Sequence, residues 1–296
     1  MELRGILAPV LTPFTPAGEV DLIALERGVD YTIEQCHADA IEAAAVETQE
    51  YQFLSHEARK DLLRKTVEFV RGRRPVIAGI SHPNPAVAIE LAHHAEDLGA
   101  QAVQALVPLR PFGGQPTRGE VLRYFEALGN AARLPIVAYI NPGPGAEVPP
   151  PLVVEIARLA PVRYFKESSR DLRRVARLIE EVDRAGHARF FTTMEMLLIT
   201  LQLGGPGATM PPPAAKIGAE IVRAYTAGDL KGAIEAQRRF SLFPGRWMQH
   251  GLAPVMKAAM RLLGVDAGLP HPPFETLPPD EVRSLEKHLR EIGLLQ

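Results

Sequence analysis

The amino-acid sequence predicts a (β/α)8 barrel followed by a C-terminal helical region. Short apolar or β-branched runs alternate with amphipathic stretches, each run ends in a loop rich in Pro, Gly or polar residues, and the alternation occurs eight times. Strands that alternate with helices build parallel sheets, and eight such units favour a closed barrel over an open sheet. With 296 residues, the chain is long enough for one barrel and an appendage.

The predicted elements follow one another at regular spacing. The strands are expected at 5–10, 40–46, 75–79, 102–107, 135–140, 162–165, 189–191 and 207–209. Amphipathic helices are expected in the intervals, for example at 21–35, 56–70, 83–98, 118–131 and 172–182. Three further helices are expected at 229–240, 247–263 and 280–292. We therefore expect a barrel over 1–228 and a three-helix appendage over 229–296.

The amino-acid composition and net charge indicate which kind of molecule the protein binds. The chain is 46% hydrophobic and 23% charged with a net charge of -2, which is typical of a globular protein that binds small molecules rather than nucleic acid or a membrane surface. A single cysteine, Cys36, excludes an intramolecular disulfide framework and a multi-cysteine metal site. No signal peptide and no apolar run of ~20 residues is evident, so a cytoplasmic location is expected.

Barrel enzymes carry their reactive groups where strands end, and this rule selects the candidate residues. The candidates are Thr12, Glu47, Thr48, Ser81, His82, Arg110, Tyr139, Lys166, Thr192, Thr193 and Thr209. A glycine-rich segment at 203–207 precedes a strand instead, so we interpret it as a turn at the opposite face and not as a phosphate loop.

Lys166 is the strongest candidate because it ends a mostly apolar strand. Burial in the barrel mouth lowers the pKa of an ammonium and yields the free amine that imine formation requires. The alternative is a solvated surface lysine. Tyr139 ends the preceding strand, and strands ~4.8 Å apart bring its hydroxyl near Lys166, where a phenol can relay protons. A tyrosine packed in the barrel core is the alternative for this residue.

The sequence resembles the pyruvate-dependent class I aldolases, which include dihydrodipicolinate synthase and N-acetylneuraminate lyase. The resemblance runs nearly end to end through the segments 5–14, 54–57, 75–79 and 203–207, together with Tyr139, Asn141-Pro142 and Phe165-Lys166-Glu167. It implies a (β/α)8 barrel, a homotetramer, Lys166 as the Schiff-base lysine and Tyr139 as the proton relay. No cofactor and no metal is expected, and the partner is a 2-keto acid substrate.

The segment 46–50 lies on the loop that holds the keto acid's carboxylate in this family, a Gly-Thr-Thr-Gly-Glu sequence. Only Thr48 and Glu50 match it. Because backbone amides can bind a carboxylate whatever the side chains are, we expect the Thr48 and Gln49 amides to retain this role, with Thr209 as a further substrate-binding residue. Glu47 replaces a threonine that takes part in the family's proton relay, and a carboxylate there can act as an acid or base.

Two departures bear on the substrate. Leu109 and Arg110 stand where dihydrodipicolinate synthase has a tyrosine pair, and Pro144 stands where it has an arginine for the second substrate's carboxylate. A lysine-pathway synthase is therefore not favoured. The guanidinium of Arg110 is either a substitute carboxylate clamp or a solvated loop group.

The leading hypothesis is a Schiff-base aldolase, or a dehydratase or hydratase, acting on a 2-keto-3-deoxy sugar acid or a similar 4-hydroxy-2-oxo acid. One imine supports both carbon–carbon cleavage and β-hydroxyl loss, since it is an electron sink in each. Two alternatives stay open. One is a metal-dependent class II aldolase using Glu47 and His82, and the other is a keto-acid sensor that has lost activity.

Overall fold

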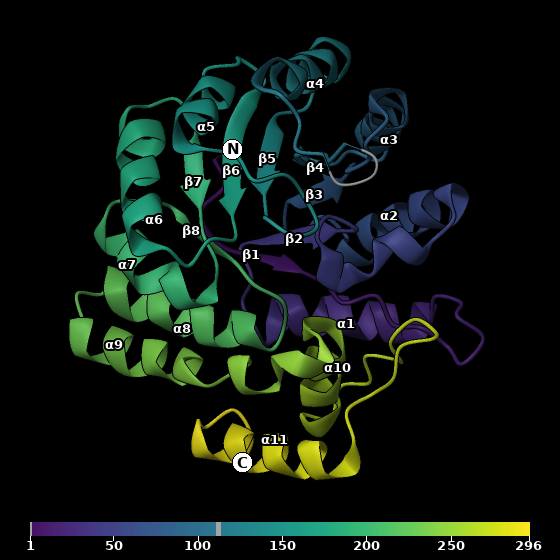
Figure 1. Ribbon diagram of the computed structural model, residues 1–296. Coiled ribbons are helices and arrows are strands. Elements are labelled where there is room, and N and C mark those ends of the chain that lie inside the picture. The colour runs from purple at the N-terminus through teal and green to yellow at the C-terminus, as the bar shows by residue number, and fades with distance from the viewer. Residues whose placement is uncertain (1, 111–113) are drawn as a thin grey trace.

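The computed structural model describes residues 2–110 and 114–296, and eight parallel strands form its centre (Figure 1). The strands are β1 (Gly5–Pro9), β2 (Ala40–Ala43), β3 (Val76–Gly79), β4 (Ala102–Leu106), β5 (Ile136–Ile140), β6 (Val162–Glu167), β7 (Arg189–Phe191) and β8 (Gly207–Thr209). Their spatial order is β7-β6-β5-β4-β3-β2-β1-β8. The ends of this sheet meet through Thr192, whose carbonyl accepts from the Thr209 amide at 2.9 Å. The predicted (β/α)8 barrel is confirmed.

Helices surround the strands in the predicted alternation (Figure 1). They are α1 (Leu22–Glu34), α2 (His56–Val70), α3 (Pro85–Asp97), α4 (Arg118–Ala131), α5 (Pro150–Ala157), α6 (Leu172–Leu178), α7 (Leu197–Gln202) and α8 (Ala214–Thr226). Several of these helices have a polar N-cap residue, whose side chain accepts a hydrogen bond from a backbone amide of the first turn. Asp21 caps α1 in this way, and Ser55 caps α2. The helix predicted at 172–182 continues past α6 as a π-helical turn over Ile179–Arg184.

The second strand is shorter than predicted. We expected it over 40–46, but it ends at Ala43, because Ala44 takes a φ of +48° that breaks the extended chain. The Ala45 and Val46 amides then donate to the Gln49 side-chain oxygen at 2.7 and 3.2 Å rather than to a strand. The backbone of this turn packs directly against Gly79, where a Cβ atom would lie 1.9 Å from the Ala44 carbonyl oxygen. The close approach requires glycine at that position.

Side chains that point into the barrel form stacked layers from alternate strands. Residues paired in register on neighbouring parallel strands point to the same face of the sheet. One apolar cluster fills the barrel interior, so its members and their register partners are the residues that point inward. An apolar layer from odd-numbered strands consists of Leu7, Ile77, Val137 and Phe191. Above it, toward the strands' carboxyl ends, the even-numbered strands contribute Glu42, Gln104, Lys166 and Thr209. Branched apolar residues usually dominate such layers, so four polar members are unusual.

The C-terminal part of the chain is helical, with α9 (Leu230–Arg238), α10 (Leu252–Leu262) and α11 (Pro279–Glu291) along one side of the barrel (Figure 1). A buried ion pair between Lys257 of α10 and Glu50 links this region to the turn after β2. Lys257 also donates to the Leu269 carbonyl at 2.7 Å. The division of the chain at residue 228 stays a prediction. Among the described residues, every helix is too short or too polar to span a lipid bilayer.

Candidate active site

Lys166 lies inside the barrel mouth and is only 6% exposed. It stands in register between Tyr139 of β5 and Phe191 of β7, and its Nζ atom lies 3.6 Å from the centroid of the Tyr139 ring. Burial lowers the pKa of the Lys166 ammonium, against the opposing effect of nearby carboxylates, of which Glu42 has the largest. The structure thus places an amine where burial shifts it toward its uncharged, nucleophilic form.

Tyr139 is almost fully buried, and its hydroxyl connects two other polar side chains. It donates to Glu47 Oε2 at 2.7 Å and accepts from Asn141 Nδ2 at 2.8 Å. Burial and then the adjacent Glu47 carboxylate hold the pKa of Tyr139 well above its usual value. The structure therefore brings Lys166, Tyr139 and Glu47 together, in an arrangement where a phenol can pass a proton to and from a carboxylate.

The turn after β2 holds Glu47, Thr48 and Gln49 in a single 3-10 turn over Glu47–Gln49. Thr48 has a buried hydroxyl without a hydrogen-bond partner among the described groups. Gln49 instead supports the turn, since its side-chain nitrogen donates to the Val10 and Glu42 carbonyls at 2.8 Å each. The Gln49 amide donates to the Val46 carbonyl at 2.9 Å, so it is engaged in this structure. Carboxylate binding by the Thr48 and Gln49 amides stays a prediction, and for Gln49 it requires this turn to open.

Glu42 and Thr209 face the barrel interior from β2 and β8, on the level of Lys166. The Thr209 hydroxyl lies 3.4 Å from Glu42 Oε1. Burial raises the pKa of the Glu42 carboxyl to about 7, against the opposing effect of Lys166. The strand-end rule did not select Glu42, because the strand was predicted to run to residue 46, whereas it ends at Ala43. A carboxylate in the otherwise apolar run from Ala40 to Ala45 was the signal available for finding it.

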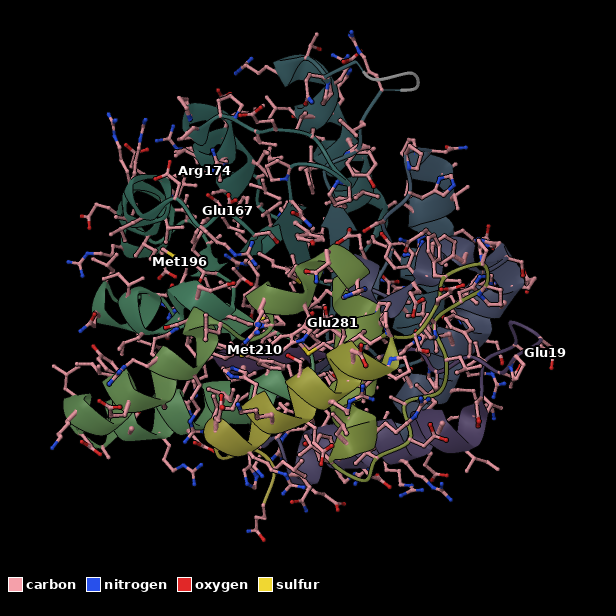
Figure 2. All side chains as sticks on the ribbon, turned by 60° about the horizontal axis from the view of Figure 1, so that its bottom comes forward. Glu19, Glu167, Arg174, Met196, Met210 and Glu281 are labelled. Atoms are coloured by element: carbon pink, nitrogen blue, oxygen red, sulfur yellow. The ribbon has the colours of Figure 1, made fainter. Side chains whose placement is uncertain are left out.

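Glu167 follows Lys166 but faces outward. It forms an ion pair with Arg174 of α6, whose Nη2 lies 2.9 Å from Glu167 Oε2, and Figure 2 shows the two side chains next to each other. Arg174 Nη2 also donates to the Val148 carbonyl at 2.8 Å. These contacts fix the end of β6 and so hold the backbone that carries Lys166.

Arg110 is exposed and already paired. Its guanidinium binds both carboxylate oxygens of Glu120, with Nε at 3.0 Å and Nη2 at 2.8 Å, at the first turn of α4. Its proposed function as a clamp for a substrate carboxylate stays a prediction. It requires the ion pair with Glu120 to open.

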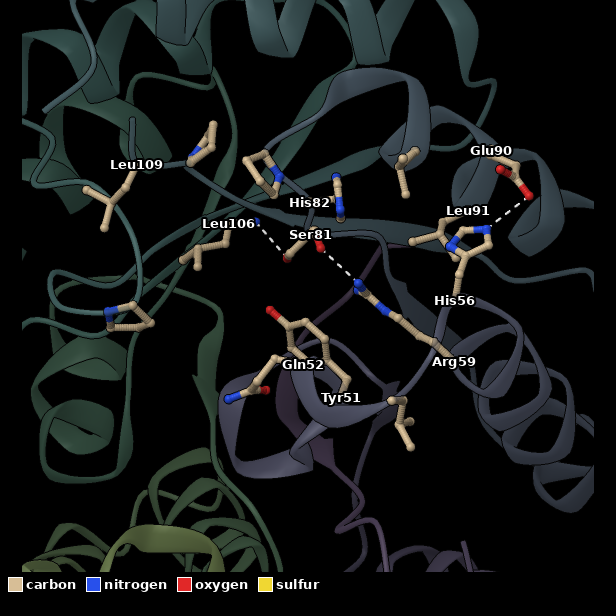
Figure 3. Close-up of a pocket in the computed structure, with 15 residues that line it drawn as sticks. Tyr51, Gln52, His56, Arg59, Ser81, His82, Glu90, Leu91, Leu106 and Leu109 are labelled. Carbon is tan, nitrogen blue, oxygen red and sulfur yellow. Dashed lines mark hydrogen bonds and ion pairs between the residues drawn. The ribbon is translucent and has the colours of Figure 1, made fainter. Parts of the chain in front are cut away.

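Two cavities flank the turn after β2. One, of about 590 Å³, lies beside α2 and is lined by Tyr51, Arg59, Ser81 and His82 among others (Figure 3). The other, of about 550 Å³, is lined by Glu47 and Thr48 on one side and by His250 and residues of 251–254 and 273–278 on the other. The first cavity has more polar side chains in its lining, but several of them are already hydrogen-bonded to other protein groups. The second cavity opens directly onto Glu47 and is therefore the better candidate for the substrate-binding cavity.

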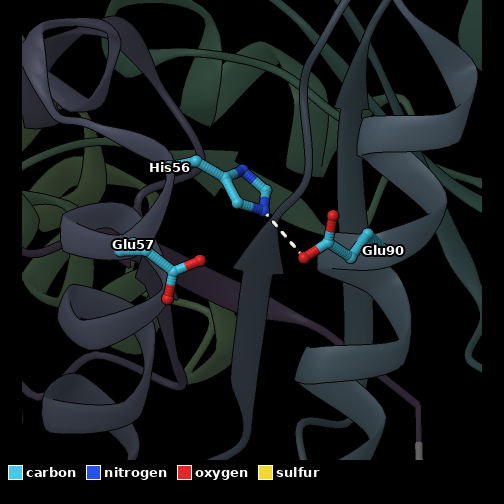
Figure 4. A group of neighbouring side chains, drawn as sticks. All are labelled: His56, Glu57 and Glu90. Atoms are coloured by element: carbon cyan, nitrogen blue, oxygen red, sulfur yellow. Dashed lines mark hydrogen bonds and ion pairs between the residues drawn. The ribbon is translucent and has the colours of Figure 1, made fainter.

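The residues expected for a class II metal site do not cluster. In the described parts of the chain, one group of three possible ligands lies within 4.8 Å, and it consists of His56, Glu57 and Glu90 (Figure 4). Lys60 already pairs with Glu90 at 3.2 Å and with Glu57 at 3.7 Å, so both carboxylates of this group already have a cationic partner. This group includes neither Glu47 nor His82.

Comparison with known proteins finds relatives that match nearly the whole chain. The chain is 29% identical to a 4-hydroxy-tetrahydrodipicolinate synthase of Moorella thermoacetica over the full length of both proteins. It is 32% identical to the enzyme of that name from an Anaeromyxobacter species, over 90% of this chain and 89% of the relative. Among solved structures, dihydrodipicolinate synthase from Thermotoga maritima superposes with a TM-score of 0.88 at 26% identity, covering 100% of both chains.

N-acetylneuraminate lyase from Mycoplasma synoviae superposes with a TM-score of 0.83 at 26% identity, covering 98% of this chain and 96% of the lyase. The sequence profile of the dihydrodipicolinate synthetase family matches residues 2–292. The match spans the barrel and its C-terminal helices. The chain therefore belongs to the dihydrodipicolinate synthetase family, the pyruvate-dependent class I aldolases.

Proposed function

We propose that this protein is a Schiff-base lyase for a 2-keto-3-deoxy sugar acid or a similar 4-hydroxy-2-oxo acid. The observation that carries the proposal is the group formed by Lys166, Tyr139 and Glu47. An amine of lowered pKa lies against a phenol that is hydrogen-bonded to a carboxylate at 2.7 Å. Imine formation needs a nucleophilic amine and a proton carrier, and this group provides both.

The proposed steps use these residues in order. The Lys166 amine attacks the keto carbon, and Tyr139 transfers protons as the carbinolamine loses water. The iminium then withdraws electrons from the C3–C4 bond. As that bond breaks, Glu47 accepts the proton of the 4-hydroxyl, an aldehyde leaves, and an enamine remains. Protonation of the enamine at C3 and hydrolysis of the iminium release pyruvate. In the dehydratase alternative, the same iminium promotes loss of a β-hydroxyl.

The cavity beside Glu47 supports a substrate that extends beyond four carbons. About 550 Å³ lies between Glu47 and the segment that includes His250, enough for a small polyhydroxylated ligand. Polar groups from 275–276 and His250 line it. They provide partners for hydroxyl groups that a simple pyruvate does not have.

A synthase forming 4-hydroxy-tetrahydrodipicolinate is the second candidate, because the relatives named above carry that activity in their names. The site differs from the family pattern for that reaction at Glu47, at the pair Leu109-Arg110 and at Pro144. A proline has no cationic group with which to bind the second substrate's carboxylate. We therefore favour the lyase activity over the synthase activity. The homotetramer expected from the resemblance stays a prediction.

A screen of 2-keto-3-deoxy acids tests the proposal directly. We expect pyruvate release, coupled to lactate dehydrogenase, from at least one acid with a 4-hydroxyl group, and no formation of 4-hydroxy-tetrahydrodipicolinate. A 2-keto product without pyruvate indicates dehydration instead. If no acid reacts and pyruvate is still trapped on Lys166, the keto-acid sensor becomes the better explanation. Efficient synthesis of 4-hydroxy-tetrahydrodipicolinate would exclude the lyase.

Glu47→Gln separates chemistry on the substrate from imine formation. We expect this variant to keep pyruvate trapping on Lys166 but to lose ~10²-fold or more in turnover, since an amide holds the Tyr139 hydroxyl without accepting a proton. One limb of the pH–rate profile should disappear. Glu195→Gln, at a partly buried glutamate paired with Arg170, is the matched control for loss of a carboxylate. Loss of trapping in Glu47→Gln contradicts the assigned role, because Glu47 would then serve imine formation itself.

A further inference from the structure

The polar layer inside the barrel brings a carboxylate opposite the reactive amine. Strands β2 and β6 are four positions apart in a ring of eight, so Glu42 and Lys166 project toward each other across the interior. Glu42 is fully buried, and one of its oxygens, Oε2, makes no hydrogen bond to a described protein group. A buried carboxylate without a direct ion-pair partner needs a reason, since its charge is costly in a low-dielectric interior.

The charged groups around Lys166 come from several elements. They are Glu42 on β2, Glu47 in the following turn, Glu167 at the end of β6 and Arg170 in the loop after it. Glu47 is hydrogen-bonded to Tyr139 at the mouth, and Glu167 is paired with Arg174 outside the barrel. Glu42 has the largest influence of the four on Lys166, and the groups that face it in turn are Lys166, Thr209 and Glu47. It is the carboxylate that is free to respond to a charge on Lys166.

Before substrate binds, burial favours the uncharged forms of both groups. It raises the pKa of Glu42 to about 7 and lowers the pKa of Lys166. Burial thus works against both an ammonium at Lys166 and a carboxylate at Glu42. Imine formation ends this state, because a protonated imine is a cation at the same buried nitrogen.

We propose that Glu42 is the internal counter-ion of the iminium on Lys166, an acid in the free protein and a carboxylate once the iminium has formed. The inference rests on the proposed function. The step balances: the C–N bond forms, the keto C–O bond breaks, and the proton that leaves Glu42 is carried away in the released water. Amine, ketone and carboxylic acid become iminium, carboxylate and water, with no proton drawn from solvent. Glu42 acts through Lys166 and is a positioning residue.

The pH dependence of trapping tests this. Pyruvate and cyanoborohydride, which reduces the protonated imine, are applied across a pH series to the wild type and to Glu42→Gln. A carboxylate stabilises a neighbouring cation, so its removal makes the nitrogen less basic. We expect the pH at which adduct formation falls by half to move down by about one unit, which is about tenfold less adduct on the alkaline side. A purely structural role would lower the yield equally at every pH.

Two further variants are the controls for this experiment. Glu42→Asp keeps a carboxylate and should hold the midpoint near that of the wild type. Gln104→Met removes a polar side chain from the same layer without an ionisable group, and its midpoint should not move. An unchanged midpoint in Glu42→Gln, with wild-type Lys166 labelled, overturns the role of Glu42 and leaves the proposed function intact. Absence of labelling in the wild type removes the proposed function as well.

A wild-type measurement covers the case in which Glu42→Gln does not fold. Calorimetry in buffers of different ionisation enthalpy counts the protons taken up when pyruvate forms the iminium. At a pH one unit below the pKa of about 7, Glu42 holds its proton and can give it up, so no net uptake is expected. Uptake of a full proton per site would show that the proton comes from solvent and would overturn the inference.

Discussion

Lys166→Arg is expected to abolish pyruvate trapping and turnover while the barrel stays folded. A guanidinium remains protonated in proteins and does not condense with a ketone, whereas the long polar side chain keeps much of the lysine's volume. Treatment of the wild type with pyruvate and borohydride should add the reduced pyruvyl group to one lysine, which peptide mapping identifies. In the variant, the adduct should be absent and circular dichroism unchanged.

Other lysines are the controls for this experiment. Lys257 is also buried, but it pairs with Glu50 and donates to the Leu269 carbonyl, so we expect it to remain unlabelled. Lys287 is 82% exposed, and Lys287→Arg should leave the labelling unchanged. An adduct on either lysine, or turnover that persists in Lys166→Arg, would contradict the Schiff-base mechanism.

Tyr139→Phe is expected to slow imine formation and turnover by ~10²-fold or more, the usual scale for a positioned proton carrier. The ring beside Lys166 remains in this variant, so contact with the amine is preserved and only the hydroxyl is lost. Asn141 Nδ2 lies 3.4 Å from Glu47 Oε2 and can bond it directly, which limits the structural damage. Stopped-flow measurement of imine formation reports the chemical step.

Tyr124→Phe is the matched control, because this buried tyrosine donates to the His82 carbonyl at 3.0 Å and lies outside the proposed proton path. Tyr139→Phe loses two hydrogen bonds of the hydroxyl and Tyr124→Phe loses one, so both variants should lose some stability, but only Tyr139→Phe should slow the reaction. A wild-type rate in Tyr139→Phe would return this residue to a packing role.

The sequence by itself was sufficient for the barrel, because each strand and each helix carries a local signal. The helices at 56–70 and 118–131 begin after Ser55 and Thr117, and these caps are visible in the sequence as well as in the structure. Lys166 and Tyr139 were found because both end apolar strands, and the ends of parallel strands meet at one edge of a barrel.

Tertiary structure decided which polar groups interact. The sequence does not reveal that Arg110 binds Glu120, or that the Gln49 side chain supports the turn that ends β2. The opposition of Glu42 and Lys166 was also hidden, since the two residues lie 124 positions apart in the sequence. Both faces of a strand in a parallel barrel are buried, so alternation along the chain does not say which residues point inward. Only strand order and register place these two side chains at one level of the interior, and burial there sets their protonation.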